Sequence, residues 1–337
     1  MKAFITATFD PEVLREMRQS MDVVYEDWRE TRKIYFSGEE LAARLRDLGA
    51  DVLIVEADLV HEEVIENTGL EMIGATRGDP VNIAIDVATA RGIPVFFAPG
   101  RNAEAVAELT VAFMLSAMRR VHEVYHELRS GALRFDENPS SFLDAYARYT
   151  GAELEGKTVG VVGFGAIGQR VTKILARGFG SRVLAYDPYV TAGTFEALGA
   201  ERCDLDFLIR SSDVLTVHCP ETPDTTGLIH AERVRALKPG AYVMNLGRAR
   251  ILDEDALYEG LVSGRIAGAG LDVLVNEPIR PAERLLQLPN VVLMPHYGGN
   301  THETVLRQSR MIVEAIDDSL AGRKSRYLCN PEVVRGT

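Results

Sequence analysis

The fold is decided by residues 158–171, which read TVGVVGFGAIGQRV. The apolar run Thr158–Val162 predicts a buried strand, and the pattern from Gln169 to Arg177 predicts a helix. In such a strand–turn–helix setting, the first glycine of a Gly-x-Gly-x-x-Gly motif permits a tight turn. The second lets a pyrophosphate approach the backbone, and the third lets helix and strand pack closely. The segment therefore predicts a dinucleotide site, with the helix N-terminus facing the phosphates; its glycines are Gly163, Gly165 and Gly168.

An acidic residue follows the next predicted strand. Residues 182–186 form that strand, and Asp187 comes directly after it, 19 residues beyond Gly168. A carboxylate there accepts hydrogen bonds from the adenosine ribose hydroxyls and repels a 2′-phosphate. The alternative, that the glycines merely serve a turn and Asp187 merely caps one, is weaker because strand, helix and acid are all in place. The sequence predicts NAD as cofactor, in preference to NADP.

Outside this segment, short β-branched runs alternate with helical stretches, which is typical of parallel sheets covered by helices on both faces. A final helical pattern, Thr301 to about Leu320, returns the chain to its first domain. The predicted fold is α/β, with two doubly wound parallel-sheet domains. They are a discontinuous flavodoxin-like substrate domain, residues 1–100 and 300–337, and an inserted Rossmann NAD domain, residues 101–299. The first-domain strands are predicted at residues 3–8, 52–55, 71–75 and 95–98.

The junction between the predicted domains has its own pattern. Asn102 is predicted to cap a single long helix, Ala103 to about Leu128, that connects the domains. The following residues, Gly131–Gly156, contain Asn138-Pro139-Ser140-Ser141 and predict an irregular, exposed excursion.

Composition excludes several classes of function. The net charge of −12 disfavours nucleic acid, because phosphate binding depends on clustered Lys and Arg. The first ten residues do not predict an export signal, and no window approaches the roughly 18 apolar residues of a membrane span. The three cysteines have no metal-like spacing, so neither a disulfide framework nor a metal site is expected. A cytoplasmic location with no membrane partner is the resulting prediction.

Three later segments carry the residue types that hydride transfer to a 2-oxo acid requires. Arg248 ends residues 245–248, and arginine binds a carboxylate with two parallel hydrogen bonds. His296 lies in residues 293–299, and histidine donates protons near neutral pH. Glu277 follows residues 270–273, and a carboxylate beside a histidine favours its protonated form. Each segment is predicted at a strand end, where open α/β sheets place their ligands.

Together with the glycine motif, these segments resemble the D-isomer-specific 2-hydroxyacid dehydrogenase family, which includes D-3-phosphoglycerate dehydrogenase, glycerate dehydrogenase and hydroxypyruvate reductase. The resemblance also covers Arg91-Gly92-Ile93-Pro94-Val95 and the stretch from Asn102 to Glu108. It implies that Arg248 binds the substrate carboxylate and carbonyl, that His296 is the acid/base and that Glu277 pairs with His296.

The resemblance implies the cofactor contacts as well. Asp272 contacts the nicotinamide carboxamide, and the strand end at residues 217–220 contacts NAD through its backbone, with His218 structural. The family usually forms homodimers through the NAD domain, so the predicted long helix and residues 131–156 are candidate contact surfaces. The other implied cofactor-lining residues are Ala166, Ile167, Asp187, Cys219, Pro220, Leu246, Gly247, Gly298 and Gly299.

The chain departs from the family where the first domain meets the substrate. Family members usually have a small, glycine-rich segment there, whereas this chain has Arg77, Gly78 and Asp79, which we predict to contact substrate. Arg77 has two interpretations, a second anion or hydroxyl contact and a solvent-facing ion pair with Asp79. Glu56 stands where phosphoglycerate dehydrogenases often carry an arginine, and it would repel a phosphate. We therefore hypothesise an unphosphorylated, polyhydroxylated acid whose hydroxyls bond Glu56 and Arg77.

The predicted function is hydride transfer between the nicotinamide of NAD and the second carbon of a small D-2-hydroxy or 2-oxo acid. Three alternatives remain open at this point. They are a D-3-phosphoglycerate dehydrogenase, a formate or phosphite dehydrogenase, and an NAD-sensing, corepressor-like binding protein built on the same framework.

Overall fold

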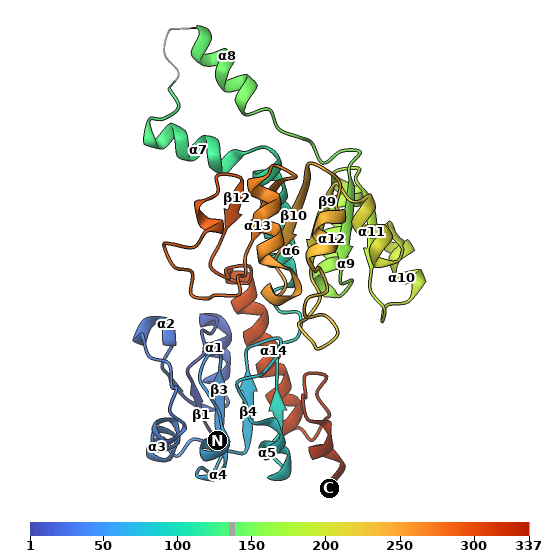
Figure 1. Ribbon diagram of the computed structural model, residues 1–337. Coiled ribbons are helices and arrows are strands. Elements are labelled where there is room, and N and C mark those ends of the chain that lie inside the picture. Colours follow the sequence, from blue (N-terminus) through green and yellow to red (C-terminus); the bar gives the residue numbers. More distant parts are fainter. Residues whose placement is uncertain (135–138, 337) are drawn as a thin grey trace. The chain divides into compact units, whose positions relative to one another are not determined.

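A computed structural model describes residues 1–134 and 139–336. The chain forms two compact units (Figure 1). Unit 1 comprises Met1–Arg101 and Asn300–Thr337, and unit 2 comprises Asn102–Gly299. None of the helices within the described ranges combines the length and apolar character needed to cross a bilayer.

Unit 1 contains a five-stranded parallel sheet in the order β2-β1-β3-β4-β5, which is the flavodoxin-like order. Its strands are β1 (Lys2–Ile5), β2 (Asp22–Tyr25), β3 (Val52–Val55), β4 (Met72–Ala75) and β5 (Val95–Phe96). Its helices are α1 (Pro11–Met17), α2 (Trp28–Thr31), α3 (Gly38–Leu48), α4 (Glu62–Glu66), α5 (Ile85–Ala90) and α14 (His302–Leu320).

The central strands β3 and β4 of unit 1 are apolar on both faces because helices cover both. Every residue of β3 is fully buried, as expected for a central strand of a parallel sheet. Side chains of α3 and α4 pack on one face, and side chains of α1 and α14 pack on the other. The segment after residue 300 thus completes the core of the first unit.

Unit 2 contains a seven-stranded parallel sheet in the order β12-β11-β10-β9-β6-β7-β8. Strands β6, β7 and β8 follow one another toward one edge of the sheet, and the chain then crosses back to β9 on the other side of β6, as in a Rossmann fold. The predicted fold class is confirmed. Its strands are β6 (Thr158–Val162), β7 (Arg182–Tyr186), β8 (Ala200–Arg202), β9 (Val214–Val217), β10 (Ala241–Asn245), β11 (Ile266–Leu271) and β12 (Val291–Leu293). Its helices are α6 (Ala103–Met118), α7 (Val121–Ser130), α8 (Pro139–Arg148), α9 (Ala166–Gly178), α10 (Ala192–Leu198), α11 (Leu205–Ser211), α12 (Ala231–Ala236) and α13 (Glu254–Val262).

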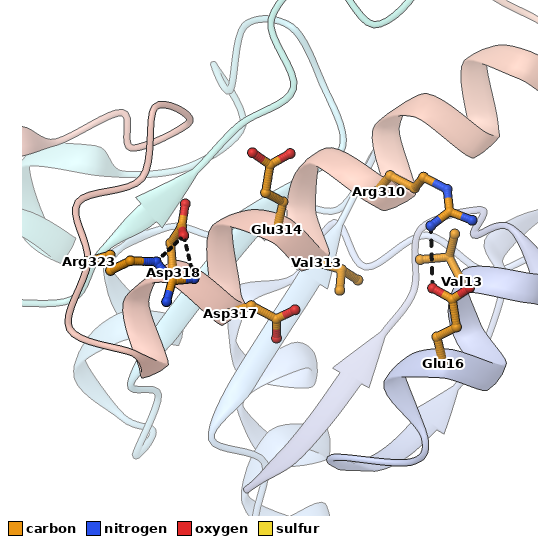
Figure 2. A pocket seen from close by; sticks show the side chains of 8 residues that line it. All are labelled: Val13, Glu16, Arg310, Val313, Glu314, Asp317, Asp318 and Arg323. Atoms are coloured by element: carbon orange, nitrogen blue, oxygen red, sulfur yellow. Dashed lines mark hydrogen bonds and ion pairs between the residues drawn. The ribbon is translucent and has the colours of Figure 1, made fainter.

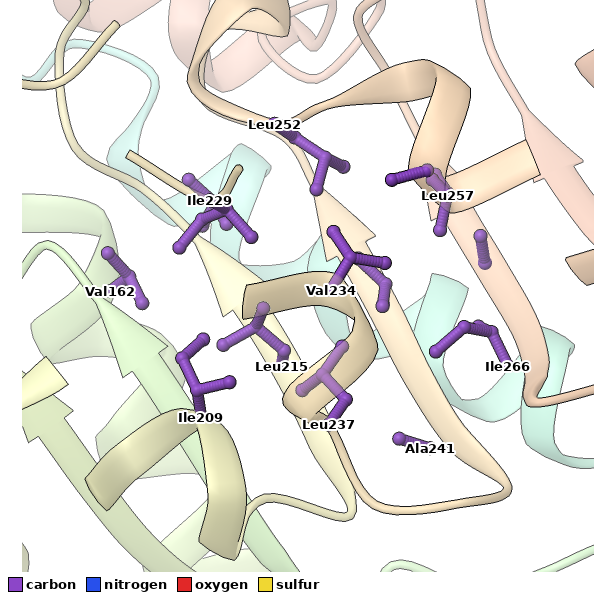
Figure 3. Close-up of a cluster of buried hydrophobic side chains, with 14 of the residues drawn as sticks. Val162, Ile209, Leu215, Ile229, Val234, Leu237, Ala241, Leu252, Leu257 and Ile266 are labelled. Atoms are coloured by element: carbon purple, nitrogen blue, oxygen red, sulfur yellow. The ribbon is translucent and has the colours of Figure 1, made fainter. Parts of the chain in front are cut away.

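Two apolar clusters hold the sheet of unit 2 between helices. One lies under α11, α12 and α13, where Ile209, Val234 and Leu257 belong to the same buried cluster as Leu215 of β9 (Figure 3). The other lies under α6 and α9. Burial of these side chains fixes the positions of the strand ends, which carry the residues considered below.

The prediction of one helix from Ala103 to about Leu128 is wrong. The helix α6 ends at Met118, and α7 begins at Val121. Between them Arg120 adopts a left-handed conformation, with φ of 54°, and its guanidinium makes two 2.8 Å hydrogen bonds to Glu123. Asn102 does occupy the predicted N-cap position of α6, but its side chain makes no capping hydrogen bond. The spacing of apolar residues in this region does not reveal that a single left-handed residue ends one helix and precedes the next.

The prediction of an irregular segment over Gly131–Gly156 is partly wrong, because Pro139–Arg148 forms the helix α8. Proline suits a first helical position because its φ is already helical and the missing N–H would lack an intrahelical partner. Arg148 donates a 2.6 Å hydrogen bond to Glu127, which ties α8 to α7. Asn138, which was part of the same prediction, lies outside the described residues.

Candidate active site

The glycine motif forms a tight loop between β6 and α9. Gly163 has a φ of +90°, and a Cβ atom there would lie 2.5 Å from the backbone nitrogen of Cys219. A Cβ on Gly168 would lie 2.1 Å from the carbonyl oxygen of Gly163. Neither position accepts a side chain without moving backbone. The third glycine, Gly165, differs, because a Cβ there would meet nothing within 4 Å.

The loop fits the phosphates of a dinucleotide. Gly165 is the N-cap of α9, and no side chain caps that helix, so the N–H groups of its first turn, including Ala166 and Ile167, remain for another acceptor. Open space beside Gly165 and uncapped N–H groups are the two features that a pyrophosphate needs.

Asp187 follows β7 and is bonded to the same loop. Its Oδ2 accepts a 2.8 Å hydrogen bond from the N–H of Phe164, and its Oδ1 accepts one of 2.9 Å from Tyr189. These bonds fix the carboxylate beside the glycine loop. The remaining predicted cofactor residues also follow strands of unit 2: Cys219 and Pro220 follow β9, Leu246 and Gly247 follow β10, Asp272 follows β11, and Gly298 and Gly299 follow β12.

The three predicted catalytic residues come from neighbouring strand ends. In the sheet, Asn245 of β10 pairs with Leu271 of β11, and Leu271 pairs with Leu293 of β12. Arg248 and His296 each follow their strand by three residues, so both lie at the carboxyl edge of the sheet. Parallel strands bring such residues to one edge even when they are far apart in sequence.

His296 and Glu277 are in direct contact. Nδ1 of His296 lies 3.1 Å from Oε2 of Glu277, and Oε1 of Glu277 accepts a 3.1 Å hydrogen bond from the N–H of Leu274. The two side chains are 51% and 35% exposed, so the histidine is open to a small molecule. With Nδ1 held by a carboxylate, Nε2 is the ring atom left for proton exchange.

Arg248 is exposed, and its Nη1 donates a 3.0 Å hydrogen bond to the carbonyl of Gly247. Across the described parts of the chain, the structure records no bond from Arg248 to His296 or Glu277. The arrangement therefore brings two of the trio into contact and leaves the third on an adjacent strand end, with most of its donors unused.

Two residues that position the trio were not identified from the sequence in this role. Asn245, 1% exposed, accepts a 3.2 Å hydrogen bond from Gly247 and donates one of 3.1 Å to the carbonyl of Arg248. Asp272 accepts hydrogen bonds from the N–H groups of Tyr297 (2.7 Å) and Gly298 (2.8 Å). Burial raises the pKa of Asp272, and these two bonds oppose that rise. The available signal was a polar residue at the end of a buried strand.

The predicted substrate residues of unit 1 follow β4. The carbonyl of Arg77 accepts a 2.8 Å hydrogen bond from Ala98, and Gly78 and Asp79 are exposed. Among the described residues, the structure records no ion pair between Arg77 and Asp79. The interpretation of Arg77 as a partner of Asp79 is therefore not supported. Glu56 already has partners, since it pairs with Arg101 at 3.5 Å and accepts a 3.2 Å hydrogen bond from Trp28.

A hollow of about 350 Å³ between α1 and α14 of unit 1 contains none of the predicted site residues (Figure 2). It is lined mainly by charged side chains, and ion pairs join Arg310 to Glu16 (3.4 Å) and Arg323 to Asp318 (2.8 Å). The candidate active site is therefore defined by the strand ends and their loops, not by this hollow.

His218, beside the glycine loop, should make stability depend on pH. Its Nε2 lies 2.8 Å from the hydroxyl of Thr216, and burial lowers its pKa from 6.5 to about 3. The unfolded chain binds this proton near pH 6.5 and the folded chain does not, so acid favours unfolding. Between pH 6.5 and about 3, this group should lower the free energy of unfolding by up to about 1.4 kcal/mol per pH unit.

The measurement is the urea unfolding midpoint at pH 6.5, 5.5 and 4.5. The variant His218→Gln should show a shallower decrease with acidification than the parent chain, and the exposed His230→Gln is the matched control. An equal decrease in parent and His218→Gln would contradict the prediction.

Comparison with known proteins points to one enzyme family. Residues 111–298 match the family model described as "D-isomer specific 2-hydroxyacid dehydrogenase, NAD binding domain". The chain is 36% identical to a protein named 2-hydroxyacid dehydrogenase YoaD from Bacillus subtilis, covering 90% of this chain and 86% of the relative. It is also 36% identical to a D-3-phosphoglycerate dehydrogenase of Archaeoglobus fulgidus, covering 88% of this chain but only 54% of that protein. A crystal structure of a D-isomer specific 2-hydroxyacid dehydrogenase from Polaromonas sp. superimposes with a TM-score of 0.85, at 29% identity, covering 97% of this chain and 98% of that one.

Proposed function

Because the chain belongs to the D-isomer-specific 2-hydroxyacid dehydrogenase family and is an NAD-dependent oxidoreductase, we propose that it interconverts a small, unphosphorylated D-2-hydroxy acid and the matching 2-oxo acid. The observation that carries this proposal is the contact between His296 and Glu277 at the sheet edge that also holds Arg248. Reduction of a carbonyl next to a carboxylate needs a proton donor and a cation that binds the carboxylate. His296, held by Glu277, supplies the proton donor, and Arg248 supplies the cation.

In the proposed mechanism, Arg248 binds the substrate carboxylate through its planar guanidinium and polarises the carbonyl. His296 donates a proton from Nε2 to the carbonyl oxygen, and in the oxidation direction Nε2 accepts the proton of the hydroxyl. Glu277 holds the imidazole through Nδ1 and stabilises its protonated form. NADH, when bound, supplies the hydride to the second carbon.

The proposed cofactor contacts follow from the loop. The N–H groups of Ala166 and Ile167 would hold the pyrophosphate, and Asp187 would hold the adenosine ribose hydroxyls. Its negative charge favours NAD over NADP. The other proposed contacts are Gly163, Gly168, Cys219, Pro220, Leu246, Gly247, Asp272, Gly298 and Gly299.

In unit 1, we propose that Arg77, Gly78 and Asp79 contact the substrate. The Glu56 carboxylate, only 13% exposed and held by Trp28 and Arg101, supports an unphosphorylated substrate because it would oppose a phosphate dianion.

The test is NADH and NADPH oxidation across a panel of 2-oxo acids, together with NAD reduction by formate and by phosphite. We expect reduction of at least one unphosphorylated 2-oxo acid, with NADH preferred to NADPH. Preferred turnover of 3-phosphohydroxypyruvate would contradict the substrate assignment. Turnover of formate or phosphite alone, or NADH binding without any turnover, would contradict the proposed reaction.

We also propose that two copies of the chain pair through α7 and α8. These helices expose large apolar side chains, namely Val121, Tyr125, Leu128, Leu143 and Tyr146. An apolar face of this kind is typical of a protein contact surface. Sedimentation of a single species at the monomer mass of 37.1 kDa would contradict the pairing.

A further inference from the structure

Three successive backbone N–H groups in the segment after β12 all donate to one residue, Asp272. The N–H of His296 donates a 2.8 Å hydrogen bond to the backbone carbonyl of Asp272. The N–H groups of Tyr297 and Gly298 donate to its carboxylate, at 2.7 Å to Oδ1 and 2.8 Å to Oδ2. β12 ends three residues before His296, so these N–H groups lie beyond the strand pairing and need other acceptors. Asp272 supplies all of them.

These hydrogen bonds hold an uncommon backbone conformation at His296. Its φ is 59°, in the left-handed region that few non-glycine residues occupy. Such a conformation persists where the surrounding structure fixes it. The direction of the His296 side chain depends on this backbone, so the 3.1 Å contact between its Nδ1 and Oε2 of Glu277 depends on the same three bonds.

Asp272 is itself fixed at the carboxyl edge of the sheet. It follows β11 directly, and its own N–H donates a 3.0 Å hydrogen bond to the carbonyl of Asn245, the last residue of β10. Burial raises the pKa of Asp272 and the two backbone bonds lower it, while the charge of His296 lowers it and that of Glu277 raises it. The carboxylate is therefore within electrostatic range of both members of the predicted acid/base pair.

The packing around the carboxylate leaves it little contact with solvent. Asp272 is only 2% exposed, and each of its oxygens already accepts one N–H. A Cβ on Gly298 would lie 2.7 Å from Oδ2 of Asp272 and 3.1 Å from Cγ2 of Val106. Glycine at this position lets the backbone approach the carboxylate closely enough to bond it. Most of the bonding capacity of Asp272 is thus directed to the segment that carries His296.

We propose that Asp272 is a positioning residue for the acid/base, because it fixes the backbone of residues 296–298 and thereby keeps the His296 ring against Glu277. This inference rests on the proposed function and adds a residue to the same site. The resemblance implies a different role for Asp272, a contact with the nicotinamide carboxamide. The observed bonds place its main effect on proton transfer by His296, and only a minor one on the affinity for NADH.

The first experiment replaces Asp272 with asparagine. Asparagine keeps the size of the side chain and one acceptor, but its NH2 group cannot accept a hydrogen bond from an N–H. We expect kcat for 2-oxo acid reduction to fall by about 100-fold, as for a reacting group that is slightly misplaced. NADH affinity, measured by fluorescence, should change little. An unchanged kcat, or a loss of NADH affinity as large as the loss of kcat, would overturn the inference.

A double-mutant cycle shows whether Asp272 acts through His296. Residues that work as one unit have non-additive effects on rate, whereas independent contacts multiply. In the His296→Asn background, Asp272→Asn should leave the residual rate, measured at high enzyme concentration, nearly unchanged. The same fold-loss in the His296→Asn background as in the parent chain would show that Asp272 acts independently of His296, and would overturn the inference.

The matched control is Asp213→Asn. Asp213 directly precedes β9, at the opposite edge of the same sheet, and its Oδ2 accepts a 2.8 Å hydrogen bond from the backbone N–H of Thr158. Its replacement removes a carboxylate that also bonds a backbone N–H, but not one beside His296. Asp213→Asn should keep the kcat of the parent chain. A loss of kcat equal to that of Asp272→Asn would show a general effect on the sheet, and would overturn the assignment.

Gly298→Ala disturbs the same hydrogen bonds without changing the charge, and it serves if Asp272→Asn does not fold. Its Cβ would lie 2.7 Å from Oδ2 of Asp272, so the carboxylate has to move away from the two N–H groups. At saturating NADH, kcat should fall in this variant, and it should not fall further in the His296→Asn background. A parent-like kcat in Gly298→Ala would overturn the inference.

Crystal structures of the variants give a readout that does not depend on turnover. In Asp272→Asn, Nδ1 of His296 should lie beyond hydrogen-bond range of Oε2 of Glu277, whereas in Asp213→Asn the two atoms should stay near 3.1 Å apart. An intact contact in Asp272→Asn overturns the inference and leaves the proposed function standing. If the parent chain reduces no 2-oxo acid, the proposed function is overturned, and these crystal structures alone decide the inference.

Discussion

Replacing His296 with asparagine is expected to lower kcat for 2-oxo acid reduction by about 100- to 10,000-fold while NADH binding stays nearly unchanged. The imidazole is the group that can both give and take a proton, and its Nδ1 contact with Glu277 leaves Nε2 for that exchange. Asparagine has no titratable proton near neutral pH. It also tolerates the left-handed backbone at this position, where φ is 59°, better than most residues.

The measurements are steady-state kinetics and NADH binding by fluorescence. His230→Asn is the control, because His230 is an exposed histidine at the N-cap of α12, where asparagine is well accepted. His296→Gln is a second variant with a longer amide. Unchanged turnover in both variants of His296 would refute its acid role. A loss of NADH binding in proportion to turnover would show that the loop, and not proton transfer, had been damaged.

Replacing Gly165 with valine is expected to weaken NADH binding by about 100-fold or more and to leave the unfolding midpoint close to that of the parent chain. A side chain at this position meets no protein atom within 4 Å, and Gly165 is not in the left-handed region, so the fold accepts it. The same side chain occupies the space in which the pyrophosphate approaches the helix N-terminus.

Two other glycines of unit 2 complete this test. Gly193→Val, in the first turn of α10, also points into open space and should change neither binding nor stability. Gly168→Ala should lower both the stability of the fold and NADH binding, because its Cβ would lie 2.1 Å from the Gly163 carbonyl oxygen. Full NADH affinity in Gly165→Val would contradict the phosphate assignment.

Much of the candidate site was predictable because its signals are local. The strand, the glycines and Asp187 lie within one βαβ unit, and the strand-end segments containing Arg248 and His296 are short. The structure corrects features that one residue controls. The left-handed Arg120 divides the predicted long helix into two. The spacing of apolar residues cannot predict the φ angle of a single residue.

By itself, the sequence determined the two-sheet α/β class and the nucleotide loop, because periodicity and glycine spacing act over a few residues. Only the tertiary structure decided which distant side chains meet. It brings Glu277 to His296, ties Asp272 to the loop that carries His296, and buries the Glu56–Arg101 pair. Those contacts depend on strand order and on packing across the sheet. Whether a charged side chain such as Glu56 has an ion-pair partner depends on residues that lie far away in the sequence.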